Sequence, residues 1–149
     1  MKKRMIFAAF AVVVAIFASC DDEKIISESG LPVSSQNFIK THFPGVAVAH
    51  VIIDRDSFGK SYTVYLINGF ELEFERNGDW DKVDGYAQAV PQSILNLIPA
   101  GIVEHITNFF PNLEIVAIDK ERFGYEIYLT GRRFELKFNH SGNFIGIDD

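Results

Sequence analysis

The chain has 149 residues, with 14 basic and 20 acidic side chains and a single cysteine. Three of the bases lie within the first four residues, so the rest of the chain carries 11 basic and 20 acidic residues, a net charge of −9. Such an acidic chain would repel the phosphate backbone that dominates nucleic-acid binding, which excludes nucleic acid as a partner. The length suits one domain with a real core, and a lone cysteine means that packing rather than disulfides must stabilise it.

Residues 1–19 have the pattern of a signal peptide. A basic start is followed by an uncharged apolar run at residues 5–17, too short for a span of roughly 20 residues. Two small residues then precede Cys20, which resembles the lipobox of bacterial lipoproteins, although Phe17 stands where leucine is usual. An ordinary signal peptide or an uncleaved anchor would leave Cys20 as a free thiol in an oxidising compartment. We therefore expect lipidation at Cys20, which would tether the protein to the membrane without spanning it.

The segment after the cysteine is predicted to be a flexible spacer. Residues 20–30 combine the lipidated cysteine with a polar, acidic stretch that ends in Gly30. Composition of this kind is typical of a linker that holds a folded domain away from the membrane. We expect the folded domain to occupy residues 31–149.

That domain contains two copies of one pattern, at residues 31–84 and 98–149, joined by a linker at 85–97. The spacing between matching positions stays between 63 and 67 residues, so the insertions fall in turns. The matches are Phe43-Pro44 with Phe110-Pro111, Phe58-Gly59 with Phe123-Gly124, Tyr65-Leu66 with Tyr128-Leu129, Phe70-Glu71-Leu72 with Phe134-Glu135-Leu136, and Trp80 with Phe144. The sequence therefore predicts two tandem repeats.

Each copy is predicted to begin with a helix that a proline ends. In the first copy, Ser34 or Ser35 can cap the helix, and Pro44 follows its apolar stripe. In the second copy, apolar residues at helical spacing lead to Pro111.

Strands follow each helix, first as an apolar run at 46–53 or 113–118 and then as an alternating hairpin. A three-residue loop with Gly69 in the left-handed conformation places Leu66 opposite Phe70, and a loop of four residues does the same in the second copy. A two-residue turn would reverse one strand and make the copies disagree, so it is rejected. The side chains predicted to face the helices are Tyr62, Val64, Leu66, Phe70, Leu72 and Phe74, then Tyr125, Ile127, Leu129, Phe134, Leu136 and Phe138.

A last short strand in each copy completes a unit of one helix and four strands. Two units can share one antiparallel sheet of about eight strands, which predicts an α+β domain with both helices on one face. The other face would stay open to water and offer a contact surface. The side chains expected on that surface are Tyr65, Glu71, Glu73, Trp80, Tyr128, Glu135 and Lys137. Tyrosine and tryptophan often anchor interfaces, although tyrosine is also a common strand former.

The stretch 62–84 resembles the repeating element of PepSY-like proteins, an alternating hairpin with a Gly-aromatic-Val close. Phe43-Pro44-Gly45 and Val90-Pro91 belong to the same pattern, and the resemblance covers residues 31–149. It implies an exported bacterial protein, lipoproteins included, with a fold similar to the beta-lactamase inhibitor protein, which grips its target with the concave open face of its sheet. Inhibition follows by analogy of fold only, and the resemblance brings no catalytic residue.

The sequence offers no catalytic constellation, no cofactor motif and no metal site. The four histidines have no ligand spacing, and neither a Gly-x-Ser-x-Gly elbow nor a Gly-rich phosphate loop is present. Residues 54–59 resemble the first half of a calcium loop, but two ligand positions are missing. We therefore expect a protein that is not an enzyme and needs no cofactor.

Two functions fit these patterns. The first is a lipid-anchored binding module of the cell envelope, in the periplasm or on the cell surface, whose open sheet face engages another envelope protein or peptide, as an inhibitor would. The second is a sensor or carrier of a small ligand or metal at the junction of the two repeats, which predicts a concave pocket with convergent polar groups.

Overall fold

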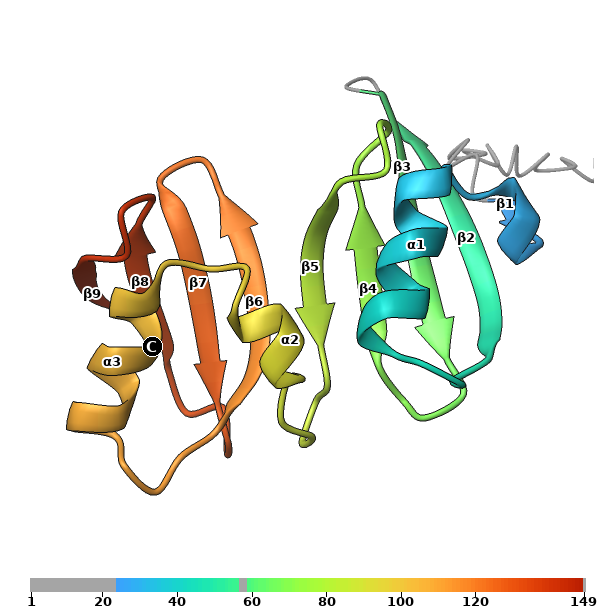
Figure 1. The fold of residues 1–149 in the computed structure, drawn as a ribbon. Helices are drawn as coiled ribbons and strands as arrows, with labels where there is room; N and C mark the ends of the chain where they lie inside the picture. Colours follow the sequence, from blue (N-terminus) through green and yellow to red (C-terminus); the bar gives the residue numbers. More distant parts are fainter. Residues whose placement is uncertain (1–23, 57–58, 149) are drawn as a thin grey trace, which may run out of the picture.

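The computed structural model describes residues 24–56 and 59–148, so the expected signal peptide and Cys20 lie outside the described residues. Nine strands form one antiparallel sheet in which each strand pairs with its neighbours in sequence (Figure 1). The strands are β1 (Lys24–Ile26), β2 (Val48–Asp56), β3 (Gly59–Leu66), β4 (Glu71–Phe74), β5 (Trp80–Asp84), β6 (Ile115–Glu121), β7 (Gly124–Leu129), β8 (Glu135–Asn139) and β9 (Phe144–Asp148). Within the described ranges, no helix is long and apolar enough to cross a membrane.

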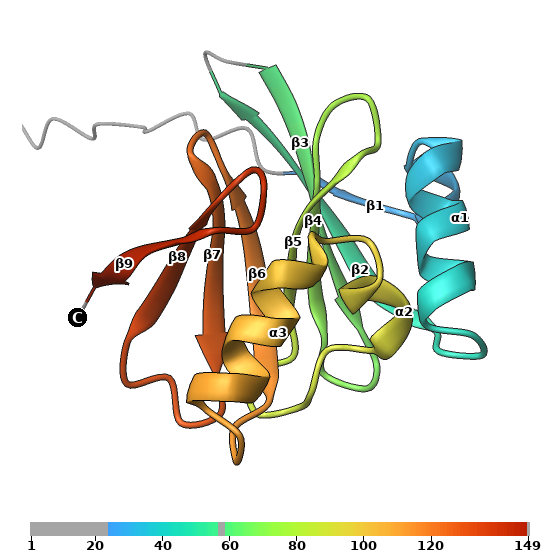
Figure 2. The same cartoon turned by 60° about the vertical axis from the view of Figure 1, so that its left-hand side comes forward.

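The helices lie on one side of this sheet (Figures 1 and 2). They are α1 (Val33–His42), α2 (Gln92–Leu95) and α3 (Ala100–Phe109), and a short 3-10 turn, η1 (Glu28–Gly30), precedes α1. Phe38 of α1 meets the ring of Phe74 at 5.6 Å, and His105 of α3 meets the ring of Phe138 at 5.3 Å. Among the described residues, no helix lies over the opposite side of the sheet.

The strand count differs from the prediction because β1 forms where a flexible spacer was expected. Ile25 and Ile26 pair with Ile52 and Val51 along the outer edge of β2. Beta-branched residues favour strands, and an uncovered sheet edge readily accepts another strand. The prediction of a flexible spacer as far as Gly30 is therefore wrong from Lys24 onward.

The hairpin registers are as predicted. Leu66 and Phe70 lie opposite each other, with the Leu66 amide donating to the Phe70 carbonyl oxygen at 2.9 Å. In the second hairpin, Tyr128 pairs with Glu135 across the expected loop at 130–133. Because successive side chains of a strand point to opposite sides, every second side chain is buried against the helices. Within the core cluster, the strand residues with 0% exposure are Val51, Val64, Leu72, Val83, Ile118, Ile127, Leu136 and Phe138.

The start of α1 differs from the expected serine cap. Pro32 occupies the N-cap position, and no side chain caps the helix. The hydroxyls of Ser34 and Ser35 instead donate to the carbonyl oxygens of Asn77 and Gly78, each at 3.1 Å. These serines therefore tie the helix to the β4–β5 turn, a role that local sequence cannot reveal.

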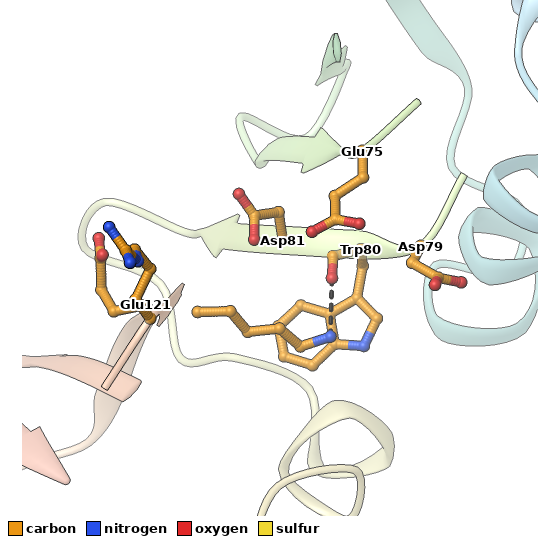
Figure 3. A pocket seen from close by; sticks show the side chains of 7 residues that line it. Glu75, Asp79, Trp80, Asp81 and Glu121 are labelled. Carbon is orange, nitrogen blue, oxygen red and sulfur yellow. Dashed lines mark hydrogen bonds between the residues drawn. The ribbon is translucent and has the colours of Figure 1, made fainter. Parts of the chain in front are cut away.

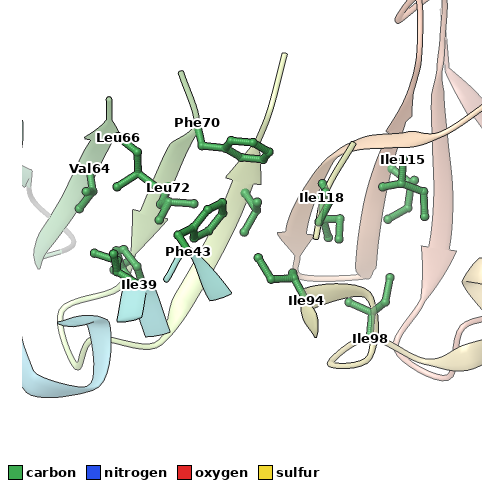
Figure 4. Packing of buried hydrophobic residues seen from close by; sticks show 14 of the residues in the cluster. Ile39, Phe43, Val64, Leu66, Phe70, Leu72, Ile94, Ile98, Ile115 and Ile118 are labelled. Carbon is green, nitrogen blue, oxygen red and sulfur yellow. The ribbon is translucent and has the colours of Figure 1, made fainter. Parts of the chain in front are cut away.

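The two halves of the sheet meet at the β5–β6 pair, where Val83 lies opposite Ile118. The linker at 85–97 contains the unpredicted helix α2, whose Ile94 is fully buried. The buried residues of both halves belong to one hydrophobic cluster, part of which is drawn in Figure 4. A single core therefore holds the sheet as one unit and fixes the side chains on its other face.

Candidate binding face

Two rows of side chains cross the uncovered side of the sheet, and we call this surface the open face. Strand pairing defines both rows, because residues opposite each other on neighbouring strands point to the same side. The first row runs from Ile25 and Ile52 through Thr63, Glu73, Lys82, Asp119, Glu126 and Lys137 to Gly146. The second row is His50, Tyr65, Glu71, Asp84, Ala117, Tyr128, Glu135 and Asp148.

The structure brings together six of the seven side chains that the sequence assigned to this surface, namely Tyr65, Glu71, Glu73, Tyr128, Glu135 and Lys137. The assignment of Trp80 to it is wrong. Trp80 pairs with Phe74 and stacks on Phe38 of α1, with ring centroids 5.9 Å apart, so it lies on the helix side. A bulge between Glu73 and Phe74 shifts the β4–β5 register at this point, which the alternation of the sequence does not show.

The basic side chains of the open face are held by carboxylates. Lys82 Nζ lies 3.6 Å from Glu71 and 3.5 Å from Glu73. Lys137 pairs with Glu126 at 3.6 Å and also with Asp148. Ion pairs of this kind contribute little to stability, but they fix the orientation of the side chains that a partner would meet.

A second cluster joins the linker to the β7–β8 loop through Tyr86 and Arg132. Among the described residues, these are the two non-glycine positions with positive φ, at 57° and 42°. Arg132 Nε donates to the Tyr86 carbonyl oxygen at 3.0 Å, and its guanidinium pairs with Asp84. The guanidinium also lies 5.5 Å from the ring centroids of Tyr86 and Tyr128. Strained backbone of this kind persists only where surrounding contacts hold it, and it concentrates at functional sites.

Tyrosine hydroxyls on this face remain hydrogen-bond donors at neutral pH. The Tyr86 hydroxyl donates to Glu71 at 2.5 Å, and this bond to a carboxylate raises the pKa of Tyr86 to about 12. Burial, followed by the charge of Asp119, raises the pKa of Tyr128, whose hydroxyl donates to Glu126 at 3.3 Å.

Asp119 stands at the centre of the first row, and its Oδ1 is buried without a hydrogen-bond partner. Burial raises the pKa of this carboxyl to about 7; the charge of Lys82 opposes the shift, and the carboxylates of Glu73, Asp84 and Glu126 reinforce it. For Lys82, burial lowers the pKa, but Asp119 and the neighbouring carboxylates outweigh it and raise the pKa overall. Among the described residues, none therefore donates a hydrogen bond to this buried oxygen of Asp119.

Replacing Asp119 by asparagine is expected to stabilise the protein at pH 8 but not at pH 4. The folded-state pKa lies above the ordinary value of 3.8, so the charged form is disfavoured in the fold and wild-type stability falls as pH rises from about 4 to about 7. Because Asp119 is partly exposed, we expect a gain of only about 1–2 kcal/mol at pH 8. Urea unfolding at both pH values measures it, and an equal difference at pH 4 and pH 8 would disprove the titration.

A groove of about 430 Å³ lies where the two halves meet, beside the β4–β5 turn and the end of β6 (Figure 3). Its lining residues are Glu75, Asp79, Trp80, Asp81, Lys120, Glu121 and Arg122. Lys120 Nζ lies 3.8 Å from the Trp80 ring centroid and donates to the Trp80 carbonyl oxygen at 2.7 Å. Burial raises the pKa of Asp81 and lowers that of Lys120. Polar groups thus converge at the junction, but the described residues contain no group of three or more histidine, cysteine or acidic side chains placed to hold a metal ion.

Several residues of the open face were not found from the sequence: Lys82, Asp84, Tyr86, Asp119 and Arg132. Alternation along β7 predicts that Glu126 faces away from the helices, as it does, whereas Asp119 would have been found only by extending β6 beyond Ile118. No sequence signal could have found Tyr86 or Arg132, because they are 46 residues apart and meet only through the β5–β6 pairing.

Together, the fold and the open face define a class of protein: an antiparallel sheet covered by helices on one side, with a polar face left for contact on the other. A family model described as “Putative beta-lactamase-inhibitor-like, PepSY-like” matches residues 60–146. The chain belongs to this family.

Three crystal structures resemble the chain over nearly their whole length. The first, from Bacteroides thetaiotaomicron, is described as a “putative calcium-regulated periplasmic protein”; it is 37% identical with a TM-score of 0.78, and the match covers 86% of this chain and 98% of that one. The second, from Bacteroides vulgatus, is a “putative periplasmic protein of unknown function”. It is 31% identical with a TM-score of 0.79, and the match covers 85% of this chain and 99% of that one. The third, from the same organism, is a “putative periplasmic protein from DUF2874 family”. It is 36% identical with a TM-score of 0.78, and the match covers 87% of this chain and 99% of that one. No curated protein matches the chain.

Proposed function

We propose that this protein is a non-enzymatic binding module of the cell envelope whose open face engages another envelope protein, in the manner of an inhibitor. The observation that carries the proposal is one broad sheet surface without a helix over it, on which Tyr65 and Tyr128 stand half-buried among carboxylates. Large side chains with restricted motion contribute most of the free energy at protein interfaces. The inhibitor-like description of the family is consistent with this use of the sheet.

The proposed location is supported by the N-terminal sequence and by the descriptions of the relatives. Residues 1–19 have the signal pattern, Cys20 is the proposed lipid attachment point, and all three similar structures are described as periplasmic. A lipid anchor would hold the domain at the membrane surface, in the periplasm or on the cell surface, and allow it to meet other envelope proteins.

We also propose that the domain arose as two tandem copies of one helix and four strands. Supporting this, the bulge at Val48/His50 between β2 and β3 has a counterpart at Ile115/Ala117 between β6 and β7. Both long helices begin after a proline cap, Pro32 and Pro99. Duplication would explain why a tyrosine stands at the same place on each half of the open face.

Substituting both Tyr65 and Tyr128 by alanine is expected to weaken partner capture by about tenfold or more, since each ring would be removed from the contact surface. The measurement is quantitative mass spectrometry of proteins that the purified protein captures from an envelope extract. Phe109→Ala is the matched control, because this ring is 68% exposed and lies on the helix side.

The proposal fails if no protein is captured, or if the double tyrosine variant captures the same proteins as the wild type. Urea unfolding of each variant separates a lost contact from a lost fold. The Tyr65→Phe and Tyr128→Phe variants keep the rings and should retain most of the binding.

A second candidate is a sensor or carrier of a small ligand or metal at the junction groove. It is favoured by the converging polar side chains around Trp80 and by the relative described as calcium-regulated. A thermal-shift screen with calcium, other divalent cations and small envelope metabolites tests it, since a ligand that binds only the folded state raises the Tm. If none of them shifts the Tm, the candidate is removed; a shift abolished by Asp79→Asn and Asp81→Asn would support the groove.

A further inference from the structure

The open face is acidic from β4 to β9. Seven carboxylates stand in its two rows: Glu71, Glu73, Asp84, Asp119, Glu126, Glu135 and Asp148. Three basic side chains reach them, and each is already held, Lys82 by Glu71 and Glu73, Lys137 by Glu126 and Asp148, and Arg132 by Asp84. The surface presented to a partner is therefore negative in sum.

These carboxylates are not simply solvated surface charges. The side chains of Asp84, Glu71 and Glu126 are only 6%, 13% and 15% exposed. Asp119 Oδ1 is withdrawn from solvent, and no described residue donates a hydrogen bond to it. A carboxylate that has lost water at one oxygen without gaining a donor costs free energy, and a cation that a partner places beside the partly exposed Asp119 would offset this cost.

Arg132 shows within the chain what such a donor looks like on this surface. Its guanidinium pairs with Asp84 and lies 5.5 Å from the ring centroids of both Tyr86 and Tyr128. A flat cation that bonds a carboxylate and stacks on aromatic rings satisfies both kinds of side chain in the rows. Tyr65 and Glu71 lie directly opposite each other on β3 and β4 and combine the same two groups.

We infer that the partner of the open face is a protein that presents arginine or lysine side chains, and that one of them lies against the partly exposed Asp119 at the centre of the sheet. This inference rests on the proposed function and names the chemistry of its partner. A partner with an acidic or uncharged contact surface would leave the seven carboxylates facing like charge or no charge, which opposes binding.

The test uses a soluble arginine-rich peptide as the probe, with a glutamate-rich peptide of equal length as its control. Fluorescence anisotropy measures their binding to the wild type, to an Asp119→Asn/Glu126→Gln variant and to a Glu104→Gln/Glu114→Gln variant. The two variants have the same net charge, but Glu104 and Glu114 are exposed and lie away from the open face. We expect the arginine peptide alone to bind, more weakly at higher salt, with an affinity about tenfold lower for the open-face variant and nearly unchanged for the other.

Equal loss in both variants would overturn the inference, because it would reflect net charge rather than this surface. Absence of binding would also overturn it. A third result would overturn the inference in favour of a metal ion. In this result, calcium chloride displaces the arginine peptide, and calcium chloride alone raises the Tm of the wild type but not the Tm of the Asp119→Asn/Glu126→Gln variant. Failure of the inference can be distinguished from failure of the proposed function. If an envelope protein is captured and the tyrosine substitutions abolish its capture, the proposed function holds. If the same protein still binds after the carboxylate substitutions and at high salt, the inference alone is wrong.

Discussion

Replacing Phe138 by alanine is expected to lower the free energy of unfolding by about 3–5 kcal/mol. The ring is fully buried in β8 and meets His105 of α3 and Phe144 of β9 edge-on, at 5.3 and 5.6 Å. Removing it leaves a cavity between the sheet and its covering helix, which these elements can fill only in part. Urea unfolding followed by circular dichroism measures the loss.

Phe109→Ala removes the same side chain from an exposed position and should cost less than about 1 kcal/mol. The comparison isolates burial, because both substitutions delete a phenyl ring from the C-terminal half. Equal losses for the two variants would mean that α3 does not pack on β8 as described.

Gly124→Ala is expected to destabilise the protein by roughly 3–5 kcal/mol, because an added Cβ would meet backbone atoms that cannot move aside. The Cβ would lie 2.1 Å from the Phe138 carbonyl oxygen and 2.5 Å from the Asn139 carbonyl carbon. Gly124 also has a φ of +148°, which disfavours any other residue. Thermal unfolding should show a markedly lower Tm for this variant.

Gly59 is the matched control, since it opens β3 as Gly124 opens β7. Its φ is +140°, but no atom of the described part of the chain lies within 4 Å of an added Cβ. Gly59→Ala should therefore cost only the backbone strain, about 1–2 kcal/mol. A Gly59→Ala variant as unstable as Gly124→Ala would contradict the close approach of β7 and β8.

The sequence was sufficient to predict those parts of the fold that depend on the alternation of apolar and polar residues along a strand. Residues two apart share a face of a strand, so the loop lengths at Gly69 and at 130–133 determined which side chains face the helices, and these registers are correct. For the same reason, alternation alone predicts that the tyrosine and glutamate positions of both hairpins lie on the open face. Alternation carries this information because it repeats over several residues.

The remaining features depend on contacts between distant segments. Trp80 was misplaced because a bulge in β4–β5 changes the register by one residue, and no composition signal marks that bulge. Arg132 reaches Tyr86 and Asp84 only because β5 and β6 join the two halves into one sheet. The position of Asp119 has the same origin, since it lies between Lys82 and Glu126 only because β5, β6 and β7 pair in one sheet. Side chains like these can be located only once the strand order is known.

Carboxyl footprinting of the captured complex tests most directly whether the open face is the binding surface. Carbodiimide labelling of acidic side chains, read by mass spectrometry, compares the protein alone with the protein bound to its partner. We predict that Glu73, Glu135 and Asp148 lose most of their labelling in the complex, while the exposed Glu104 and Glu114 label as before. Protection of Glu104 and Glu114 with unchanged labelling of the open-face carboxylates would place the partner elsewhere and contradict the account.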